Sequence, residues 1–179
     1  MKKLLFTILF VSVCLNSFAQ SDTDANELKI NMSNLIGFKW LDIGYERILN
    51  EESSIGLGTL ISLDNTVEGL DEYRTFSLTP YYRHFFSNKY AQGFFVEAFT
   101  MIHSGRTEEY YYAALPPYNE IIVENKYTDL AVGVSVGAKW VTARGFVAEI
   151  YAGIGRDMLE QSDIEVVGRG GVSIGYRFQ

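Results

Sequence analysis

The chain has two histidines, His84 and His103, and histidine is the side chain best suited to acid–base chemistry near neutral pH. Ser104 follows His103 directly, and two glutamates, Glu97 and Glu108, are close in the sequence. These residue types could form a site in which the histidine activates the serine hydroxyl. A His–Ser dipeptide is unspecific by itself, and no longer catalytic motif surrounds it. We therefore expect His103 to be a histidine of the aromatic girdle or of a loop base, and keep acyl-transfer chemistry at His103 and Ser104 as an alternative.

Carboxylates are the second group that could do chemistry, because calcium binds to clusters of acidic side chains. The segments expected to be loops contain Asp64, Glu68, Asp71, Glu72, Glu108, Glu109, Glu120, Glu124, Asp157, Glu160, Asp163 and Glu165. No loop has the DxDxDG spacing of a calcium site, so we expect solvated acidic loops. The only cysteine, Cys14, lies in the N-terminal leader, which leaves no thiolate for a metal or a disulfide. No metal and no cofactor are predicted.

Eight segments alternate between apolar and polar residues, which is the pattern of a β-strand with two different faces. They cover residues 27–35, 41–46, 55–62, 76–83, 94–99, 129–139, 146–153 and 168–179. Pro80 cannot donate a ladder hydrogen bond, so it predicts a bulge or a gap in pairing. We find no segment with a helical period, and we predict an all-β fold of eight strands.

The connections between these strands alternate in length. Those at 50–53, 87–92 and 142–145 are short, and those at 64–73, 104–126 and 156–165 are long. The short break at 37–39 is the exception to this alternation. Antiparallel neighbours place all the short turns at one end and the long loops at the other, as in outer-membrane barrels. We therefore predict an eight-stranded antiparallel up-and-down transmembrane β-barrel with short periplasmic turns and longer external loops.

The polar faces of the strands carry equal numbers of acidic and basic residues. They are Lys29, Asp42, Glu46, Arg83, Glu97, Asp129, Lys139, Glu149, Arg169 and Arg177. An enclosed interior needs such a balance, because an unpaired buried charge costs several kcal/mol. An eight-stranded barrel is just wide enough for side chains to fill it, so we predict a packed charge network in the lumen. A solvated sheet surface is the plain alternative. In a secreted soluble barrel that binds an apolar ligand, the charges would face outward.

Aromatic residues of the apolar face collect at its short-turn end. They are Tyr45, Tyr82, Phe86, Phe94, Trp140, Phe146, Tyr176 and Phe178. The middle of that face is aliphatic, so the arrangement predicts an interfacial aromatic girdle next to a lipid-facing band.

The N-terminus has the pattern of a secretory signal peptide. Lys2 and Lys3 precede the apolar run 4–13, and Ser17 and Ala19 are small residues at the positions of a cleavage site. We divide the chain into a signal peptide (1–19), a flexible lead-in (20–26) and the barrel (27–179). Lipidation of Cys14 is the alternative for the leader. Loss of the two lysines leaves 13 basic against 22 acidic residues, a net charge of −9 that argues against nucleic acid as a partner.

The run Leu41–Arg47 (LDIGYER) and the ending Gly175–Phe178 (GYRF) resemble small eight-stranded outer-membrane barrels of the OmpA/OmpX type from Bacteroidetes-type bacteria. The resemblance implies a cell outer membrane location in a Gram-negative bacterium, with membrane lipid and lipopolysaccharide as partners. It also implies that the barrel-insertion machinery reads the final strand, here through Val172, Ile174, Tyr176 and Phe178. The chain departs from this pattern by ending one residue after the phenylalanine.

On this resemblance the protein is a non-enzymatic structural and surface scaffold. Segment 104–126 contains Tyr110–Tyr112 and Pro116–Tyr118, an aromatic composition that suits a surface ligand and equally suits an extension of the hairpin above the membrane. Barrels of this size also include enzymes that modify lipids at the outer leaflet, so a lipid-modifying enzyme using His103 and Ser104 remains the alternative function.

Overall fold

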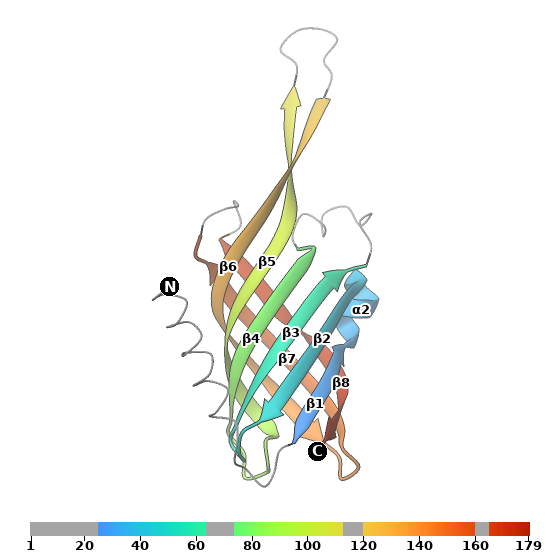
Figure 1. Cartoon of the computed structure of the whole chain (residues 1–179), viewed down its shortest axis with the longest axis vertical. Coiled ribbons are helices and arrows are strands. Elements are labelled where there is room, and N and C mark those ends of the chain that lie inside the picture. The colour runs from blue at the N-terminus through green and yellow to red at the C-terminus, as the bar shows by residue number, and fades with distance from the viewer. Residues whose placement is uncertain (1–24, 64–73, 113–119, 160–164) are drawn as a thin grey trace, which may run out of the picture.

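The computed structural model describes residues 25–63, 74–112, 120–159 and 165–179, which form eight strands and one short helix. The elements are β1 (Asn26–Asn31), α2 (Met32–Phe38), β2 (Trp40–Ile48), β3 (Ser53–Ser62), β4 (Phe76–Phe85), β5 (Gly93–Tyr112), β6 (Glu120–Val141), β7 (Phe146–Asp157) and β8 (Val166–Phe178). Each strand pairs with its neighbours in the sequence, and β1 pairs with β8, so the sheet closes (Figure 1). The predicted all-β, eight-stranded, antiparallel up-and-down barrel is confirmed.

Figure 1 shows the connections β2–β3, β4–β5 and β6–β7 together at one end, which we call the short-turn end. The opposite end, where β3–β4, β5–β6 and β7–β8 are connected, is the long-loop end. The pairing of Leu28 with both Tyr45 and Tyr176 shows that β1 bridges β2 and β8 with all three apolar faces in register. Because the sheet closes on itself, the barrel wall has no open edge strand.

Successive side chains point alternately into and out of the barrel, as strand geometry requires. The acidic and basic residues of the polar faces are buried inside, and Arg83, for example, is 1% exposed. The apolar residues point outward, and Val134, in the middle of the wall, is 57% exposed. The orientation is therefore inverted relative to a water-soluble barrel with an apolar cavity.

Large aromatic rings share the lumen with the charges and are matched by glycines on adjacent strands. The inward-pointing ring of Phe95 lies beside Gly137, where a Cβ atom would be 2.6 Å from the ring carbon Cζ. Phe99 and Gly133 form a similar pair at 2.4 Å. These glycines make room for the rings inside a narrow barrel, which explains their positions on the polar face.

The helix α2 corrects the prediction of a strand through residue 35 and of a fold without helices. The side chain of Asn31 accepts a hydrogen bond from the backbone N–H of Asn34 at 3.2 Å and so caps the first turn. Lys39 ends the helix in a left-handed conformation, with φ of 54°. The alternation of Leu28, Ile30 and Met32 reaches only the first residue of the helix, and a helix of seven residues is too short to show a clear helical period in the sequence. β1 begins at Asn26, just before the predicted start.

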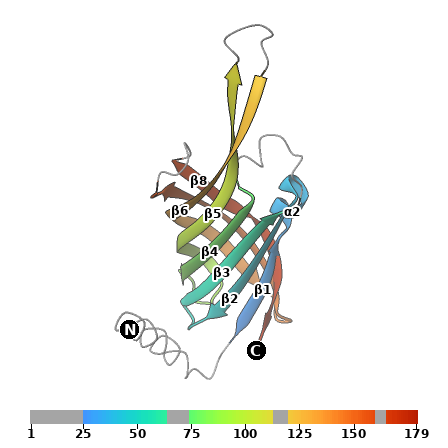
Figure 2. The same ribbon diagram turned by 45° about the horizontal axis from the view of Figure 1, so that its top comes forward.

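The connection β5–β6 is the second correction. We predicted a loop over 104–126, but β5 continues to Tyr112 and β6 begins at Glu120, in unbroken register from Ser104–Thr128 to Tyr112–Glu120. Figures 1 and 2 show this pair of strands rising well beyond the rest of the barrel. The tyrosines at 110–112 and the branched residues at 121–123 favour strands, in agreement with the extended hairpin that we considered beside recognition.

Pro80 interrupts the ladder between β4 and β5, as predicted. Pairing is present at Leu78–Ile102 and resumes at Tyr81–Phe99, in the same register, so the proline causes a gap and no bulge. Among the described residues, no helix is long and apolar enough to cross a membrane. The predicted signal peptide, Cys14 and most of the lead-in lie outside the described residues.

Candidate functional site

Charged side chains from seven strands meet in the middle of the lumen. This group, the lumen cluster, consists of Glu27, Lys29, Glu46, Arg83, Glu97, Lys139, Glu149, Arg169 and Arg177. Each of its glutamates is at most 2% exposed. The strand alternation puts all nine residues on the inner face, and the narrow barrel brings them into contact.

Arg83 is the centre of the lumen cluster. Its Nε donates to Glu97 at 2.6 Å, and its Nη1 donates to Glu46 at 2.9 Å and to Glu149 at 2.6 Å. The guanidinium also lies over the rings of Phe95 and Tyr81, at 4.3 and 4.6 Å from their centroids. A planar cation with several donors suits such a site, because it pairs with carboxylates at its edge and stacks on rings with its face.

Two lysines complete the inner part of the cluster. Lys29 lies 2.5 Å from Glu46 and 2.8 Å from Glu149, and Lys139 lies 2.5 Å from Glu46 and 2.8 Å from Glu27. Ser54 donates a further hydrogen bond to Glu46 at 2.6 Å. Glu46 therefore has several donors, as a buried carboxylate needs to offset its loss of hydration.

Two arginines of β8 close the cluster at its sides. Arg177 pairs with Glu27 at 2.6 Å and also donates to the backbone carbonyl of Ala91 at 2.8 Å. Arg169 pairs with Glu97, which it shares with Arg83. The final strand thus contributes to the polar interior as well as to the outer wall.

The structure brings together eight of the ten charges assigned to the lumen from the sequence. Asp42 instead accepts hydrogen bonds from the amides of Asn31 and Asn34, at 3.1 and 2.8 Å. Asp129 lies toward the long-loop end, where its carboxylate accepts from the backbone N–H groups of Leu130 and Leu159. The short side chains of both aspartates are thus held by groups nearer the barrel mouth than the lumen cluster.

Glu27 is the cluster member that the sequence analysis missed. It is fully buried and bridges Lys139 and Arg177. Its position two residues before Lys29, on the same face of one strand, was the available signal. We had placed it at the first residue of the expected strand and did not count it.

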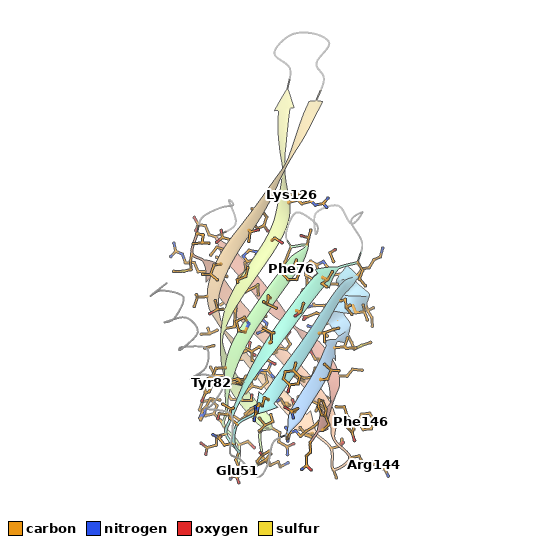
Figure 3. All side chains as sticks on the ribbon, in the orientation of Figure 1. Glu51, Phe76, Tyr82, Lys126, Arg144 and Phe146 are labelled. Carbon is orange, nitrogen blue, oxygen red and sulfur yellow. The ribbon has the colours of Figure 1, made fainter. Side chains whose placement is uncertain are left out.

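The eight aromatic residues assigned to a girdle all point outward and are 42–62% exposed. Figure 3 shows two of them, Tyr82 and Phe146, near the short-turn end, with Phe76 toward the opposite end. The rings of Phe146 and Tyr176 contact edge to face, with centroids 5.8 Å apart. On β8, Val172, Ile174, Tyr176 and Phe178 form one outward row, the face assigned to an insertion signal.

His103 and Ser104 do not form the pair considered from the sequence. They are neighbours on β5, so His103 points into the barrel and is 1% exposed, whereas Ser104 is on the other face. His103 Nε2 lies 2.8 Å from Asp157 on β7, and the Tyr127 ring contacts the imidazole edge to face. A histidine cannot activate a hydroxyl on the opposite side of the barrel wall. His84 packs on Phe86 at the short-turn end, with ring centroids 4.8 Å apart.

Within the described part of the chain, no group of three or more histidine, cysteine, aspartate or glutamate side chains is arranged to hold a metal ion. Several of the acidic loop residues considered for calcium lie in 64–73 and 160–164, outside the described residues. The charged groups at the centre of the lumen are all engaged with one another, which suits a structural role.

No family model matches the chain, and no curated protein matches it. Among solved structures, it is similar to the N-terminal beta-barrel domain of Pseudomonas aeruginosa OprF, with a TM-score of 0.59 and 9% sequence identity. The match covers 87% of this chain and 100% of that domain. At this identity the similarity shows the fold, an eight-stranded barrel, and leaves the activity open.

Proposed function

We propose that the protein is a non-enzymatic barrel of the outer membrane of a Gram-negative bacterium, where it acts as an anchor and surface scaffold. The observation that carries the proposal is the inverted orientation of the barrel wall. Charged residues fill the interior, and an aliphatic band bordered by aromatic residues covers the exterior. This arrangement is stable in a lipid bilayer. A closed barrel pairs all the backbone hydrogen-bonding groups of its strands, and the apolar outer band contacts acyl chains.

The alternative of a secreted soluble barrel with an apolar ligand requires the opposite orientation. Val132, Val134 and Val136 of β6 are each about half exposed, and equivalent residues surround the wall. In water, such a continuous apolar band would favour aggregation. The alternative of a lipid-modifying enzyme at His103 and Ser104 lacks its catalytic geometry, because the two side chains are on opposite faces.

In this proposal the short-turn end faces the periplasm and the long-loop end faces the cell exterior. The β5–β6 ribbon, residues 105–112 and 120–127, then projects from the cell surface (Figure 1). Among the described residues, its two outer edges have no neighbouring strand. An open strand edge can pair with a strand of another protein. The open edges of the ribbon therefore favour segment 104–126 as the binding site for a surface ligand.

The remaining partners follow from the same location. Membrane phospholipid and lipopolysaccharide would cover the outer band, and the aromatic girdle would lie at the periplasmic interface. The row Val172, Ile174, Tyr176 and Phe178 on β8 is accessible from outside and is our candidate contact for the barrel-insertion machinery.

The experiment that tests the proposal is heat-modifiability of the membrane fraction on a denaturing gel. We expect the protein in the outer-membrane pellet, with a faster-migrating band in the unboiled sample, because a closed hydrogen-bonded barrel resists detergent. Recovery in the periplasmic or secreted fraction, without a shift on boiling, would overturn the proposal. A periplasmic soluble protein and a known outer-membrane protein serve as fractionation controls.

A further inference from the structure

A cavity of about 200 Å³ lies at the long-loop end of the lumen, between the lumen cluster and α2. Its wall includes Trp40, Asp42, Arg74, Ser77, Thr79 and Arg169. Because a water molecule occupies about 30 Å³ in the liquid, the cavity has room for a small molecule. It is smaller than the roughly 300–1,000 Å³ of pockets that hold drug-sized ligands.

Arg74 is the unusual residue of this wall. It precedes β4, is 7% exposed, and lies over the Trp40 ring with its guanidinium carbon 5.5 Å from the centroid. Nη2 donates to the backbone carbonyl of Gly168 at 3.0 Å, and the partner of Nη1 among the described residues is the sulfur of Met101, at 2.9 Å. Nε is buried, with no hydrogen-bond partner in the part of the chain that the structure describes.

Among the described residues of the cavity wall, Asp42 is the carboxylate that attracts the Arg74 guanidinium, but it does so without a hydrogen-bonded ion pair. Asp42 is held by the amides of Asn31 and Asn34, and the structure gives it no ion pair with Arg74. Arg169 already shares Glu97 with Arg83, so it adds positive charge to the same wall. Burial lowers the pKa of Arg74 below the usual arginine value, as expected for a cation with little compensation for its lost hydration.

The buried, incompletely bonded guanidinium therefore calls for an acceptor that the described residues do not supply. A thioether is a weak acceptor, and a buried cation without a hydrogen-bonded carboxylate partner is not compensated for its lost hydration. The hydroxyl groups of Ser77 and Thr79 belong to the same wall and can donate to an anion. This combination of arginine and hydroxyl donors matches the requirements of phosphate and carboxylate groups.

We propose that this cavity is a binding site for a small oxyanion, a phosphate or a carboxylate, held by Arg74 with Arg169 as the second cation. The site goes beyond the scaffold function and does not depend on the membrane in which the barrel resides. Trp40 forms part of the site and would sense the ligand through the guanidinium that lies on its ring.

The test uses the full chain, after cleavage of any leader, refolded in detergent micelles. The sequence contains two tryptophans, so Trp140→Phe leaves Trp40 as the single fluorophore. Inorganic phosphate and, separately, acetate are titrated at constant ionic strength set with chloride. We expect a saturable change of Trp40 emission with at least one of the two anions.

Arg74→Gln in the same background should weaken the apparent affinity at least tenfold, because it removes the charge and the donor fork. The matched control is Arg156→Gln, which makes the same charge change at the same end of the barrel but on its exposed outer face. We expect the control to bind as the parent does. If the glutamine variant fails to fold, Arg74→Lys is used instead. It keeps the positive charge but loses the paired N–H donors of the guanidinium, so it should bind the anion at least several-fold more weakly than the parent.

Each folded variant is checked by heat-modifiability before titration. The proposal is overturned if neither anion gives a saturable response in the parent. It is also overturned if the Arg74 variants bind as tightly as the parent, or if Arg156→Gln weakens binding equally, which would indicate a general charge effect.

Discussion

At the scale of single residues, the lumen cluster shows how the alternation of side chains along each strand produces a packed polar interior. Arg83 contacts three glutamates that come from three different strands, β2, β5 and β7. None of these contacts is local in sequence. The inward direction of each side chain follows from its strand, but the partner depends on which residues the barrel brings to the same height.

Arg83 is the residue whose loss we expect to destabilise the barrel most. Arg83→Met leaves Glu46, Glu97 and Glu149 with fewer donors in a buried site, and removing one partner of a buried ion pair costs about 3–5 kcal/mol. We expect the free energy of unfolding, measured by urea titration in lipid vesicles, to fall by that amount.

The control for this prediction is Arg144→Met in the exposed turn between β6 and β7, which should change the free energy of unfolding by no more than about 0.5 kcal/mol. Adding Glu149→Gln to the Arg83 variant removes one uncompensated charge and should restore part of the loss. Equal stability of the Arg83 and Arg144 variants would show that the cluster does not hold the barrel together.

At the scale of elements, the β5–β6 ribbon is separate from the wall. Among the described residues, β5 pairs with β6 and with no other strand through 105–112, and the pairing of β4 ends at Ser104. A two-stranded ribbon outside the wall contributes little to the closed sheet. Its presence therefore calls for a reason other than barrel stability, such as the surface recognition proposed above.

We expect the barrel to fold without the ribbon. Replacing residues 108–124 by Asn-Gly would close the hairpin with a two-residue turn after the pair Thr107–Asn125. The shortened protein should keep its heat-modifiable band and, within error, its urea midpoint in vesicles. The full-length protein refolded in parallel is the reference. Loss of the shift on boiling would mean that the ribbon takes part in barrel closure.

The helix α2 lies at the long-loop end and borders the proposed oxyanion cavity through Asn34 and Phe38. The capping bond from Asn34 to Asn31 places the Asn34 side chain where it can hold Asp42. A strand in this position would have continued the wall instead. The element that our sequence analysis missed is thus one that shapes the mouth of the barrel.

At the scale of the whole molecule, the barrel is a filled cylinder. The cluster and the inward aromatic rings occupy its middle, where a cavity of about 20 Å³ lies beside Arg83 and Glu149. That space is about enough for one water molecule. The arrangement suits an anchor rather than a passage for solutes.

We therefore expect no steady conductance from the protein in a planar lipid bilayer. Recordings in 1 M KCl should show no discrete current steps after insertion, because ions would have to cross the packed charges of the cluster. Insertion itself is verified by heat-modifiability of the same preparation in vesicles, and a known porin calibrates the bilayer. Reproducible steps that scale with protein concentration would contradict a closed lumen.

The sequence alone was enough to predict the number of strands, their order along the wall and which residues face outward. These properties are local, because alternation along one strand decides the direction of every side chain on it. The lengths of the turns also predicted which connections lie at each end of the barrel. The aromatic residues indicated which end carries the girdle. Even the missed member of the cluster, Glu27, follows the alternation of its strand.

Which inward residues meet depends on the closed barrel as a whole. The tilt and stagger of the strands set the height of each residue in the lumen, and no single segment encodes that height. This is why His103 pairs with Asp157 and not with Ser104, and why Asp42 is held by two asparagines. The cavity around Arg74 likewise exists only because β2, β4, β8 and α2 converge at one end of a closed barrel.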